Sequence, residues 1–361
     1  MKITKISLLI ISIAILYSCK NTATKKSSTQ VKDQELTVHN LAFYNVENLF
    51  DTINDPNTLD EKSPILEIKN GQSAVYRQKV KNMATVIAGI GKDKTGSAPT
   101  LIGLAEIENE TVIRDLIESS ILKAENYGYI HFDSKDARGI DVALLYKKEH
   151  FIPIDFRRKA LRLSAETGEK YFSRDQLVVT GYLEEERIHL IVNHWPSRRG
   201  GEEKSNHLRE KAAYLTTTIC DSIFTSESAA KIGILGDFND NPTNTSFKTV
   251  LDTKKTKAVL KDKDIYNPYE SLFKEGHHTL VYRDNLFLFD QVLVSKGFIA
   301  EENTYDSLSF FSAHVHNPSF LTQATGRYKN YPFRSFVRNS FTNGYSDHYP
   351  VYITLVKNKK S

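Results

Sequence analysis

An apolar run that ends in an acid and an amide is the feature of this chain that most constrains its fold. Residues 232–242 read Ile-Gly-Ile-Leu-Gly-Asp-Phe-Asn-Asp-Asn-Pro. The run predicts a buried strand whose end presents Asp237 and Asn239 to a cleft, because residues two apart in a strand point to the same face. Gly236 predicts a close approach by another backbone or a ligand. Taken alone, this run fits a strand that ends in a polar turn equally well. The ends of the other predicted strands must therefore distinguish a functional site from a simple turn.

Further predicted strands carry polar side chains of the same kind. Strands are predicted over residues 36–46, 100–105, 139–146 and 287–294, and a hairpin over residues 176–183 and 187–194. A last strand, residues 346–355, opens with a Ser-Asp-His triplet, and Asp290 is expected inside its own strand. The polar side chains collected from these strands are Asn45, Glu47, Glu106, His194, Asp237, Asn239, Asp290, Asp347 and His348.

Helical segments alternate with these strands. Apolar residues at helical spacing predict helices over residues 75–90, 108–123 and 202–224, and a short helix is expected after Pro242. Residues 51–72 and 302–345 show little periodicity and are interpreted as loops. The 361 residues, 40% hydrophobic and 25% charged, have the composition of an ordinary globular chain. The alternation indicates an α/β fold, which we assign to one domain over residues 37–361.

The N-terminal residues have the layout of a bacterial lipoprotein signal. Lys2 and Lys5 precede an apolar stretch over residues 6–15, and Ser18 stands before Cys19. We therefore predict a signal peptide over residues 1–18, lipidation of Cys19 and a flexible tether over residues 19–36, with an uncleaved anchor as the alternative. The protein would then lie in the cell envelope, held on a bacterial membrane by its lipid. Without Lys2 and Lys5 the formal net charge falls from +4 to +2, which favours no class of partner.

The collected side chains favour metal-assisted phosphate chemistry. Carboxylates and amides are hard oxygen ligands of the kind that Mg²⁺ prefers, and Mn²⁺ and Ca²⁺ are alternatives. Two histidines near carboxylates, His194 and His348, supply acid and base groups near neutral pH. The sequence has no glycine-rich phosphate loop, no His-Glu-x-x-His, no paired Cys-x-x-Cys and no nucleophile elbow. Hydrolysis by metal-activated water is therefore favoured over a covalent intermediate.

Six short motifs follow one another along nearly all of residues 37–357. They are Asn45-x-Glu47, Glu106 after an apolar strand, Asn193-His194, Gly236-Asp237-Phe238-Asn239, Asp290 before Gln-Val-Leu-Val-Ser, and Ser346-Asp347-His348. Their order resembles that of the endonuclease/exonuclease/phosphatase superfamily, typified by deoxyribonuclease I. The resemblance implies a four-layer α-β-β-α sandwich, in which two mixed β-sheets pack face to face with helices outside.

The resemblance also implies a metal site. Glu106 would be the main metal ligand, and Asn45 and Asp347 would lie near the metal or its waters. Glu47 matches a position that helps to organise these ligands.

Catalytic and phosphate-binding roles follow in the same way. Asp237 and Asn239 resemble the pair that orients the attacking water and the phosphate. His194, and His348 supported by Asp290, resemble the two histidines that contact the scissile phosphate. Outside these motifs, Arg174 resembles a phosphate-contacting arginine of deoxyribonuclease I.

Some of these residues have structural alternatives. Asp347 could cap a turn, and His194 could be a hydrogen-bonded structural histidine. Arg198 and Arg199 could contact a phosphate backbone or simply be solvated. Asp141 could orient His194 or face solvent from its strand.

The favoured function is a surface-anchored or secreted Mg²⁺-dependent phosphodiesterase, a nuclease with a nucleic acid as its substrate. A sphingomyelinase-type lipid phosphodiesterase and a phosphatase are the enzymatic alternatives, because aromatic and basic residues over residues 310–338 suit either a base or a membrane interface. A catalytically silent surface-binding protein is the other class. Nothing in the sequence indicates an obligate protein partner.

Overall fold

Two six-stranded mixed sheets form the centre of the part of the chain that the computed structural model describes, residues 35–164, 168–301 and 304–359. The first sheet has the order β15 (Ser309–Val315), β18 (Val351–Asn358), β1 (Leu36–Leu49), β2 (Leu101–Ile107), β4 (Asp141–Lys147) and β3 (Tyr127–His131). The second has the order β11 (Ile265–Tyr266), β14 (Asp290–Ser295), β10 (Lys231–Asp237), β9 (Glu186–His194), β8 (Gln176–Leu183) and β5 (Phe151–Lys159). In each sheet one pair is parallel, β1 with β2 and β9 with β10, and the other pairs are antiparallel.

Shorter elements connect and cover the sheets. Three hairpins pair β6 (Arg162–Ser164) with β7 (Lys170–Phe172), β12 (Leu280–Tyr282) with β13 (Asn285–Phe287), and β16 (Phe336–Val337) with β17 (Ser340–Phe341). The α-helices are α1 (Gln72–Gly89), α2 (Lys92–Thr95), α3 (Glu110–Ile117), α4 (Glu202–Ser226) and α5 (Tyr269–Lys274). Single turns of 3-10 helix cover Asp60–Lys62, Lys123–Glu125, Lys257–Val259, Lys296–Phe298 and Ser319–Leu321, and Ser246–Val250 is π-helical. None of the helices described is both long and apolar enough to cross a bilayer.

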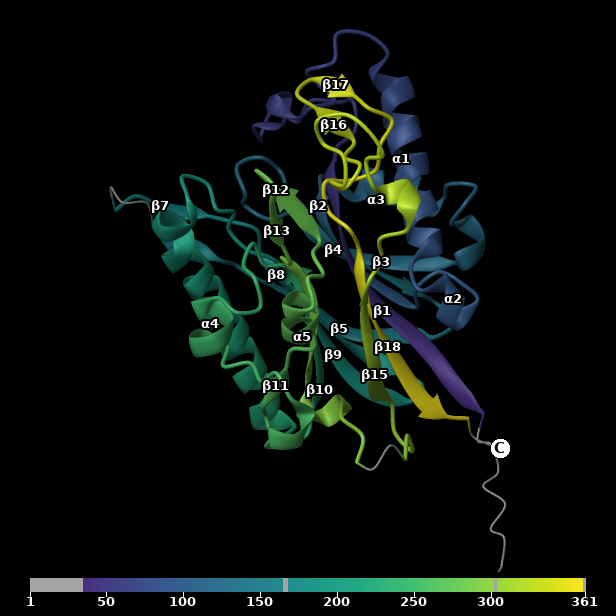
Figure 1. Cartoon of the computed structure of the whole chain (residues 1–361), viewed down its shortest axis with the longest axis vertical. Helices are drawn as coiled ribbons and strands as arrows, with labels where there is room; N and C mark the ends of the chain where they lie inside the picture. Colours follow the sequence, from purple (N-terminus) through teal and green to yellow (C-terminus); the bar gives the residue numbers. More distant parts are fainter. Residues whose placement is uncertain (1–34, 165–167, 302–303, 360–361) are drawn as a thin grey trace, which may run out of the picture. The chain divides into compact units, whose positions relative to one another are not determined.

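The layers follow from the alternation of side chains along the buried strands. On β1, Leu41 and Phe43 pack in the core between the two sheets, whereas Ala42 and Tyr44 pack in the core beneath α1 and α3. Because both faces are covered, the strand is apolar on both sides. Figure 1 shows α1 and α3 on one side of the sheets and α4 on the other.

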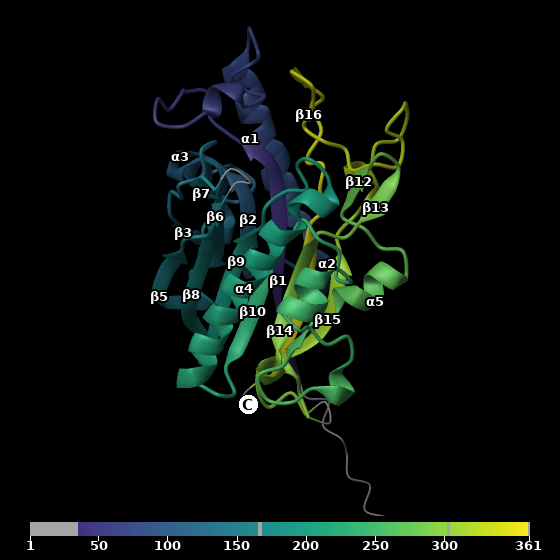
Figure 2. The ribbon, with the colours of Figure 1, turned by 90° about the vertical axis from the view of Figure 1, so that its left-hand side faces the viewer.

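The outer face of the second sheet is covered by α4. Ile219 and Ile223, one helical turn apart, pack in one core with Ile232 and Ile234 of β10. Figure 2 shows α4 in front of β9 and β10. The predicted four-layer α-β-β-α sandwich is therefore confirmed.

The structure corrects several predicted elements. Residues 302–345, interpreted as a loop system, contain the sheet strand β15, and β3 and β5 were not predicted. Asp290 opens β14 instead of lying inside the strand, because residues 288–289 leave the sheet between β13 and β14. The helix predicted over 108–123 ends at Ile117. Residues 1–34, with the predicted signal peptide, Cys19 and most of the tether, lie outside the described residues, and β1 begins at Leu36.

Candidate active site

Three neighbouring strands of the second sheet place polar side chains at one level. Asp237, the last residue of β10, is in register with His194, the last residue of β9, and with Asp290, the first residue of β14. Gly236 permits this packing, because a Cβ there would stand 2.5 Å from the carbonyl oxygen of Asn193 on β9. The predicted close approach of a second backbone is thus confirmed.

The first sheet brings Asn45 and Glu106 to the same edge through irregular backbone. Asn45 pairs with Ala105, and the register of both strands shifts immediately afterwards. Glu47 and Glu106 adopt left-handed φ angles of 49° and 65°. Such conformations cost roughly 1–3 kcal/mol in residues other than glycine, and active sites are among the places where they cluster. The bulge turns the Glu106 side chain toward Asn45 and away from the regular alternation of β2.

The amide of Asn45 joins the two sheets. Its Nδ2 donates to Glu106 Oε1 at 3.2 Å and to Asp237 Oδ2 at 3.0 Å. Its Oδ1 accepts from the backbone N–H of Glu47 at 3.0 Å, and the N–H of Asn48 donates to Glu106 Oε2 at 2.8 Å. Asn45 therefore holds the carboxylates of Glu106 and Asp237 next to each other.

Asp237 is close to both predicted histidines. Its Oδ2 is 3.7 Å from His194 Nε2 and 3.9 Å from His348 Nε2, and His194 Nε2 is 4.0 Å from Glu106 Oε1. His348 Nδ1 is bonded to Asp290 Oδ2 at 2.7 Å, which orients the imidazole. Ligand atoms of Asp237, Asp290 and His348 all lie within 4.8 Å of one another. The structure thus brings these four predicted catalytic residues into one buried cluster.

The fifth predicted catalytic residue, Asn239, lies beside this cluster. Its backbone N–H donates to Asp237 Oδ1 at 2.9 Å, and its Nδ2 donates to the carbonyl of Trp195 at 3.1 Å. Asn239 itself has a φ of 51°, which asparagine tolerates better than most residues. The turn after β10 therefore fixes both the acid and the amide.

Electrostatics give the two histidines different protonation states. Burial would lower the pKa of His348, but the carboxylates of Asp290 and Asp237 outweigh burial and raise that pKa well above its usual range. Burial and the nearby charges of Arg174 and Arg138 lower the pKa of His194 well below its usual range. One imidazole is therefore held charged and the other neutral near pH 7.

The acids of the cluster are short of compensating positive charge. Burial, and next the charge of Asp347, raise the pKa of Glu106, and burial raises the pKa of Asp237 to about 6. A divalent cation relieves such a surplus of negative charge. The side chains of Glu106 and Asp347 are 19% and 30% exposed, so their oxygens can be reached from solvent. The donor set therefore fits a hard cation such as Mg²⁺, with Glu106 and Asp347 as the carboxylates that would hold it.

Glu47, predicted among the metal-site residues, has protein partners on both carboxylate oxygens. Oε2 accepts from the N–H of Ser335 at 2.6 Å, and Oε1 accepts from Arg334 Nε at 3.1 Å. Arg334 Nη2 also bonds Asp347 Oδ2 at 3.1 Å. Burial, followed by repulsion from Asp347, raises the pKa of Glu47 to about 7. Glu47 is therefore connected to Asp347 through Arg334, and its role as an organising residue stays a prediction.

The three arginines predicted to bind phosphate have different environments. Arg174 is buried behind His194, where its Nη2 donates to the carbonyl of Trp195 at 2.6 Å. Arg198 donates to the Asn239 carbonyl at 2.8 Å and to Asp240 at 3.1 Å, so its guanidinium fastens the turn after β10. Arg199 is exposed and lines a cavity beside the cluster.

Three buried polar atoms of the cluster point to a missing partner. Among the residues described, His194 Nδ1, Arg174 Nε and Asp290 Oδ1 are buried without a hydrogen-bond partner. Native proteins leave few such atoms unpaired, and each calls for a water, an ion or a ligand. Asp141, by contrast, is buried and contacts His131 at 3.5 Å, so the alternative that it faces solvent is wrong, and it does not hydrogen-bond the unpaired His194 Nδ1.

Two basic residues near the site were not assigned to it from the sequence. Lys79 is buried, and its Nζ donates to the carbonyls of Val46 and Glu47 at 3.1 and 2.7 Å. The burial of Lys79 could have been predicted from the sequence, because the lysine stands at the helical spacing of the apolar residues Val75, Met83 and Ile87. Arg334 carries no comparable signal, because only the folded loop brings it to Glu47 and Asp347.

The fold and the site together form an arrangement suited to phosphate chemistry. Two face-to-face sheets gather acids, an amide and two histidines at one edge, the groups that metal-assisted hydrolysis of a phosphate ester uses.

Comparison with a family model gives the family. Residues 40–357 match the model of the endonuclease/exonuclease/phosphatase family, and the chain belongs to this family. A comparison with curated proteins found no match.

Solved structures share the fold at low sequence identity. D. rerio TDP2 complexed with a single-strand DNA product is 12% identical, with a TM-score of 0.51 over 88% of this chain and 99% of that one. An endonuclease/exonuclease/phosphatase family protein from Bacteroides thetaiotaomicron is 16% identical, with a TM-score of 0.51 over 91% and 100% of the two chains. A mannosyl-6-phosphatase from the same organism is 16% identical, with a TM-score of 0.51 over 88% and 99%.

Proposed function

We propose that this protein is a Mg²⁺-dependent phosphodiesterase whose substrate is a nucleic acid. The observation that carries the proposal is that two separate cavities with basic lining residues adjoin the site, one lined by Asp347 and the other by Asn48, whose N–H donates to Glu106. A phosphomonoester needs only one such cavity beyond its phosphate, whereas a diester extends in both directions.

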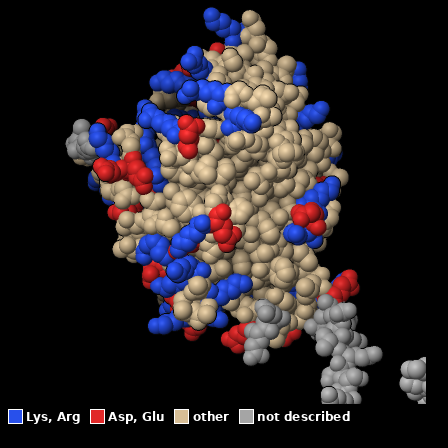
Figure 3. Space-filling view, in the orientation of Figure 1, with Lys and Arg blue, Asp and Glu red and all other residues tan. Residues whose placement is uncertain are grey.

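The first cavity, about 350 Å³ in volume, adjoins Asp347. Its aromatic and basic lining residues include Tyr328, Tyr331, Phe333, Arg283, Arg327 and Arg334. Tyr328 is 43% exposed, and the Arg327 guanidinium lies 6.0 Å from its ring centroid. Exposed aromatic rings beside cations suit base stacking next to phosphates. Figure 3 shows lysine and arginine side chains around a hollow beside the loops that carry β16 and β17, which also line this cavity.

The second cavity has a volume of about 360 Å³. It is lined by Asn48, whose backbone N–H donates to Glu106, and by Lys62, Arg138 and Arg199. Cations at this position suit phosphates on the other side of the scissile bond, because phosphate contacts position a strand without reading its sequence. Of the two alternatives left open for Arg199, we thus propose contact with the phosphate backbone.

The residues of the cluster have separate roles in the proposed reaction. Mg²⁺ bound at Glu106 and Asp347 would supply a Lewis acid for the phosphate and lower the pKa of a bound water. Charged His348, held by Asp290, would bind a phosphate oxygen or donate a proton to the leaving oxygen. Asp237, fixed by Asn45 and the Asn239 N–H, would accept a hydrogen bond from the attacking water. Neutral His194, 3.7 Å from Asp237 Oδ2, would contact the phosphate through its Nε2.

A substrate panel tests the proposal. With Mg²⁺, we expect hydrolysis of single-stranded DNA, duplex DNA or RNA, and a fall of at least about 10²-fold when a chelator removes the metal. Sphingomyelin, inositol phosphates and mannose 6-phosphate complete the panel. Turnover of a monoester or of sphingomyelin that exceeds turnover of every nucleic acid would replace the nuclease by the phosphatase or the lipid phosphodiesterase. Failure on every ester, by a folded protein with Mg²⁺, would favour a silent binding protein.

Tyr328→Ala tests the cavity beside Asp347 within the same panel. Stacking of a base on an aromatic ring is worth about 1–3 kcal/mol. The variant should therefore raise KM for single-stranded nucleic acid roughly 5- to 100-fold and affect a small aryl phosphodiester far less. Tyr214→Ala is the matched control, since Tyr214 is 69% exposed on α4. Equal KM values for both variants would remove the stacking role.

We further propose that the enzyme is anchored in the cell envelope through lipidated Cys19. The support is the sequence alone, a basic and apolar leader with Ser18 before Cys19. Cys19→Ser should move the protein from the membrane fraction to the soluble fraction or block its maturation. Metabolic labelling with a fatty acid, followed by fractionation, measures this. A wild-type protein that takes up no label and fractionates like the variant contradicts the anchor.

A further inference from the structure

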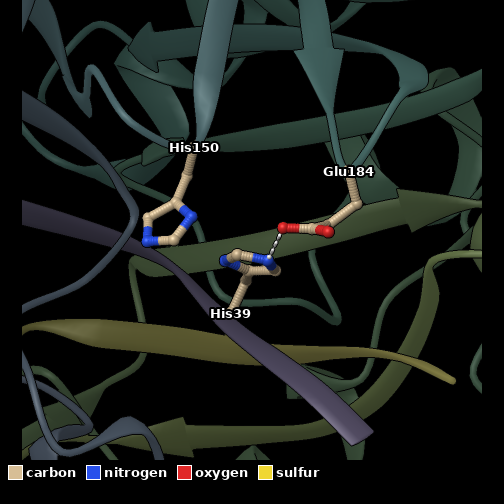
Figure 4. Close-up of side chains that lie close together, drawn as sticks. All are labelled: His39, His150 and Glu184. Carbon is tan, nitrogen blue, oxygen red and sulfur yellow. Dashed lines mark hydrogen bonds and ion pairs between the residues drawn. The ribbon is translucent and has the colours of Figure 1, made fainter. Parts of the chain in front are cut away.

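A second group of metal-ligating side chains lies far along β1 from the active site. His39 is on β1, His150 is in the turn between β4 and β5, and Glu184 is in the turn between β8 and β9. His39 Nε2 and Glu184 Oε1 are 2.9 Å apart, and one ligand atom from each residue lies within 4.8 Å of the other two. Figure 4 shows the two imidazoles and the carboxylate converging from three separate segments.

His39 is prepared as a metal ligand. The residue is only 2% exposed, and its Nδ1 is bonded to the hydroxyl of Thr100 at 2.9 Å. This bond fixes the ring and leaves Nε2 directed at Glu184, the arrangement in which a second partner orients a ligating histidine.

Glu184 is held in an uncommon backbone conformation. Glu184 and Glu185 form the two-residue turn of the β8–β9 hairpin with φ angles of 50° and 65°. Asparagine and glycine are the usual residues in such turns, because other side chains are disfavoured in the left-handed region. Lys357 Nζ holds the Glu184 carbonyl at 2.9 Å. The turn thus brings the Glu184 carboxylate to His39, although asparagine or glycine would suit the backbone of this turn better.

We propose that His39, His150 and Glu184 bind one transition-metal ion of the Zn²⁺ type. Two imidazole nitrogens and one carboxylate oxygen form a ligand set that Zn²⁺ uses, whereas Mg²⁺ prefers oxygen ligands alone. Ligands of a tetrahedral ion with bonds of about 2.0–2.1 Å lie about 3.3 Å apart. The His39–Glu184 pair is already this close, and exposed His150 needs only a small side-chain movement. Of the cations around the group, Lys357 Nζ bonds the Glu184 carbonyl and Lys147 is paired with Glu125 at 2.6 Å.

The bound ion would fasten the two sheets together. His39 belongs to the first sheet, Glu184 to a hairpin of the second, and His150 to the connection from one sheet to the other. His39 and Asn45 are six residues apart on one strand, which corresponds to roughly 20 Å. The ion would therefore stabilise the sandwich without touching the phosphate.

Titration with Co²⁺, a spectroscopic substitute for Zn²⁺, tests the site in the presence of saturating Mg²⁺. The wild-type protein should show the intense visible absorption of tetrahedral Co²⁺, and Zn²⁺ should displace that Co²⁺. His150→Ala should weaken binding by at least the roughly 10- to 100-fold that loss of a supporting residue costs. At a Zn²⁺ concentration of 100 times Kd, the wild-type Tm should rise by several degrees. His150→Ala should lose this rise.

Three matched variants serve as controls for the origin of the Co²⁺ signal. They distinguish binding at this site from binding at an exposed surface histidine, from binding at the active site, and from a His39–Glu184 hydrogen bond that needs no metal. His207→Ala removes an exposed histidine of α4 and should keep the Co²⁺ signal. Glu106→Gln alters the active site and should also keep the signal. Glu184→Gln should lose Co²⁺ affinity, whereas a purely structural His39–Glu184 hydrogen bond would show only a change in metal-free stability. No tetrahedral signal in the wild type, or an equal signal in His150→Ala, overturns the proposal.

Discussion

His348→Ala is expected to lower turnover by about 10² to 10⁴, the usual contribution of a general acid or base. His348 Nδ1 is bonded to Asp290, and its Nε2 lies 3.9 Å from Asp237 Oδ2, so the imidazolium is oriented toward the centre of the cluster. Alanine removes both the charge and the proton donor. Steady-state kinetics on the best substrate of the panel, at saturating Mg²⁺, measures the change.

The loss should fall on kcat more than on KM, because the contacts in the two flanking cavities remain. His194→Ala should show a loss of similar size, since its Nε2 lies 3.7 Å from the same Asp237 oxygen that His348 approaches. Asp290→Asn should keep the imidazole in place but remove the charge that raises the pKa of His348. The arm of the pH–rate profile that falls as His348 loses its proton should therefore move to lower pH.

His277→Ala is the control, because His277 is exposed on the loop after α5. Its activity should match the wild type. Full activity of both His348→Ala and His194→Ala, in protein shown to be folded, would mean that the cluster around Asp237 does not perform the chemistry.

The strand ends of this site were predictable because strands buried on both faces read as continuous apolar runs with clear ends. The run that ends at Asp237 is apolar on both faces, and its acid follows a glycine, which marks where the strand meets a neighbouring backbone. The same reasoning placed His194 and Glu106 at strand ends. Register between strands is a property of the sheet, so the alignment of His194, Asp237 and Asp290 became visible only in the structure.

Contacts between distant segments could not be predicted in this way. Arg334 reaches Glu47 across 287 residues of sequence, and the loop that carries it has no periodic pattern. β15 was missed for a related reason, since its outer residues Phe311 and His314 interrupt the apolar alternation expected of a strand. The left-handed conformation of Glu106 has no sequence signal either, because glutamate rarely adopts it.

Glu106→Gln is expected to reduce kcat/KM at limiting Mg²⁺ by at least about 10²-fold. The substitution keeps the shape of the side chain but removes the carboxylate charge that a hard cation requires. The side chain of Asn45 and the backbone N–H of Asn48 each donate to one oxygen of Glu106. Glutamine has only one acceptor oxygen, so its NH₂ group would face one of these two donors. Mg²⁺ titration of activity, together with calorimetric Mg²⁺ binding, measures the loss.

Metal-free stability should change in the opposite direction. Burial, and repulsion from Asp347, raise the pKa of Glu106, which means that its charged form destabilises the folded protein when no cation is bound. The neutral amide should therefore leave the metal-free Tm unchanged or higher, so lost activity cannot be attributed to unfolding. Glu108→Gln is the matched control two residues away, since Glu108 accepts the Asp51 N–H at 2.6 Å, outside the cluster. Wild-type Mg²⁺ dependence in Glu106→Gln would exclude Glu106 as a metal ligand, and equal losses in both variants would indicate a general effect of altering this loop.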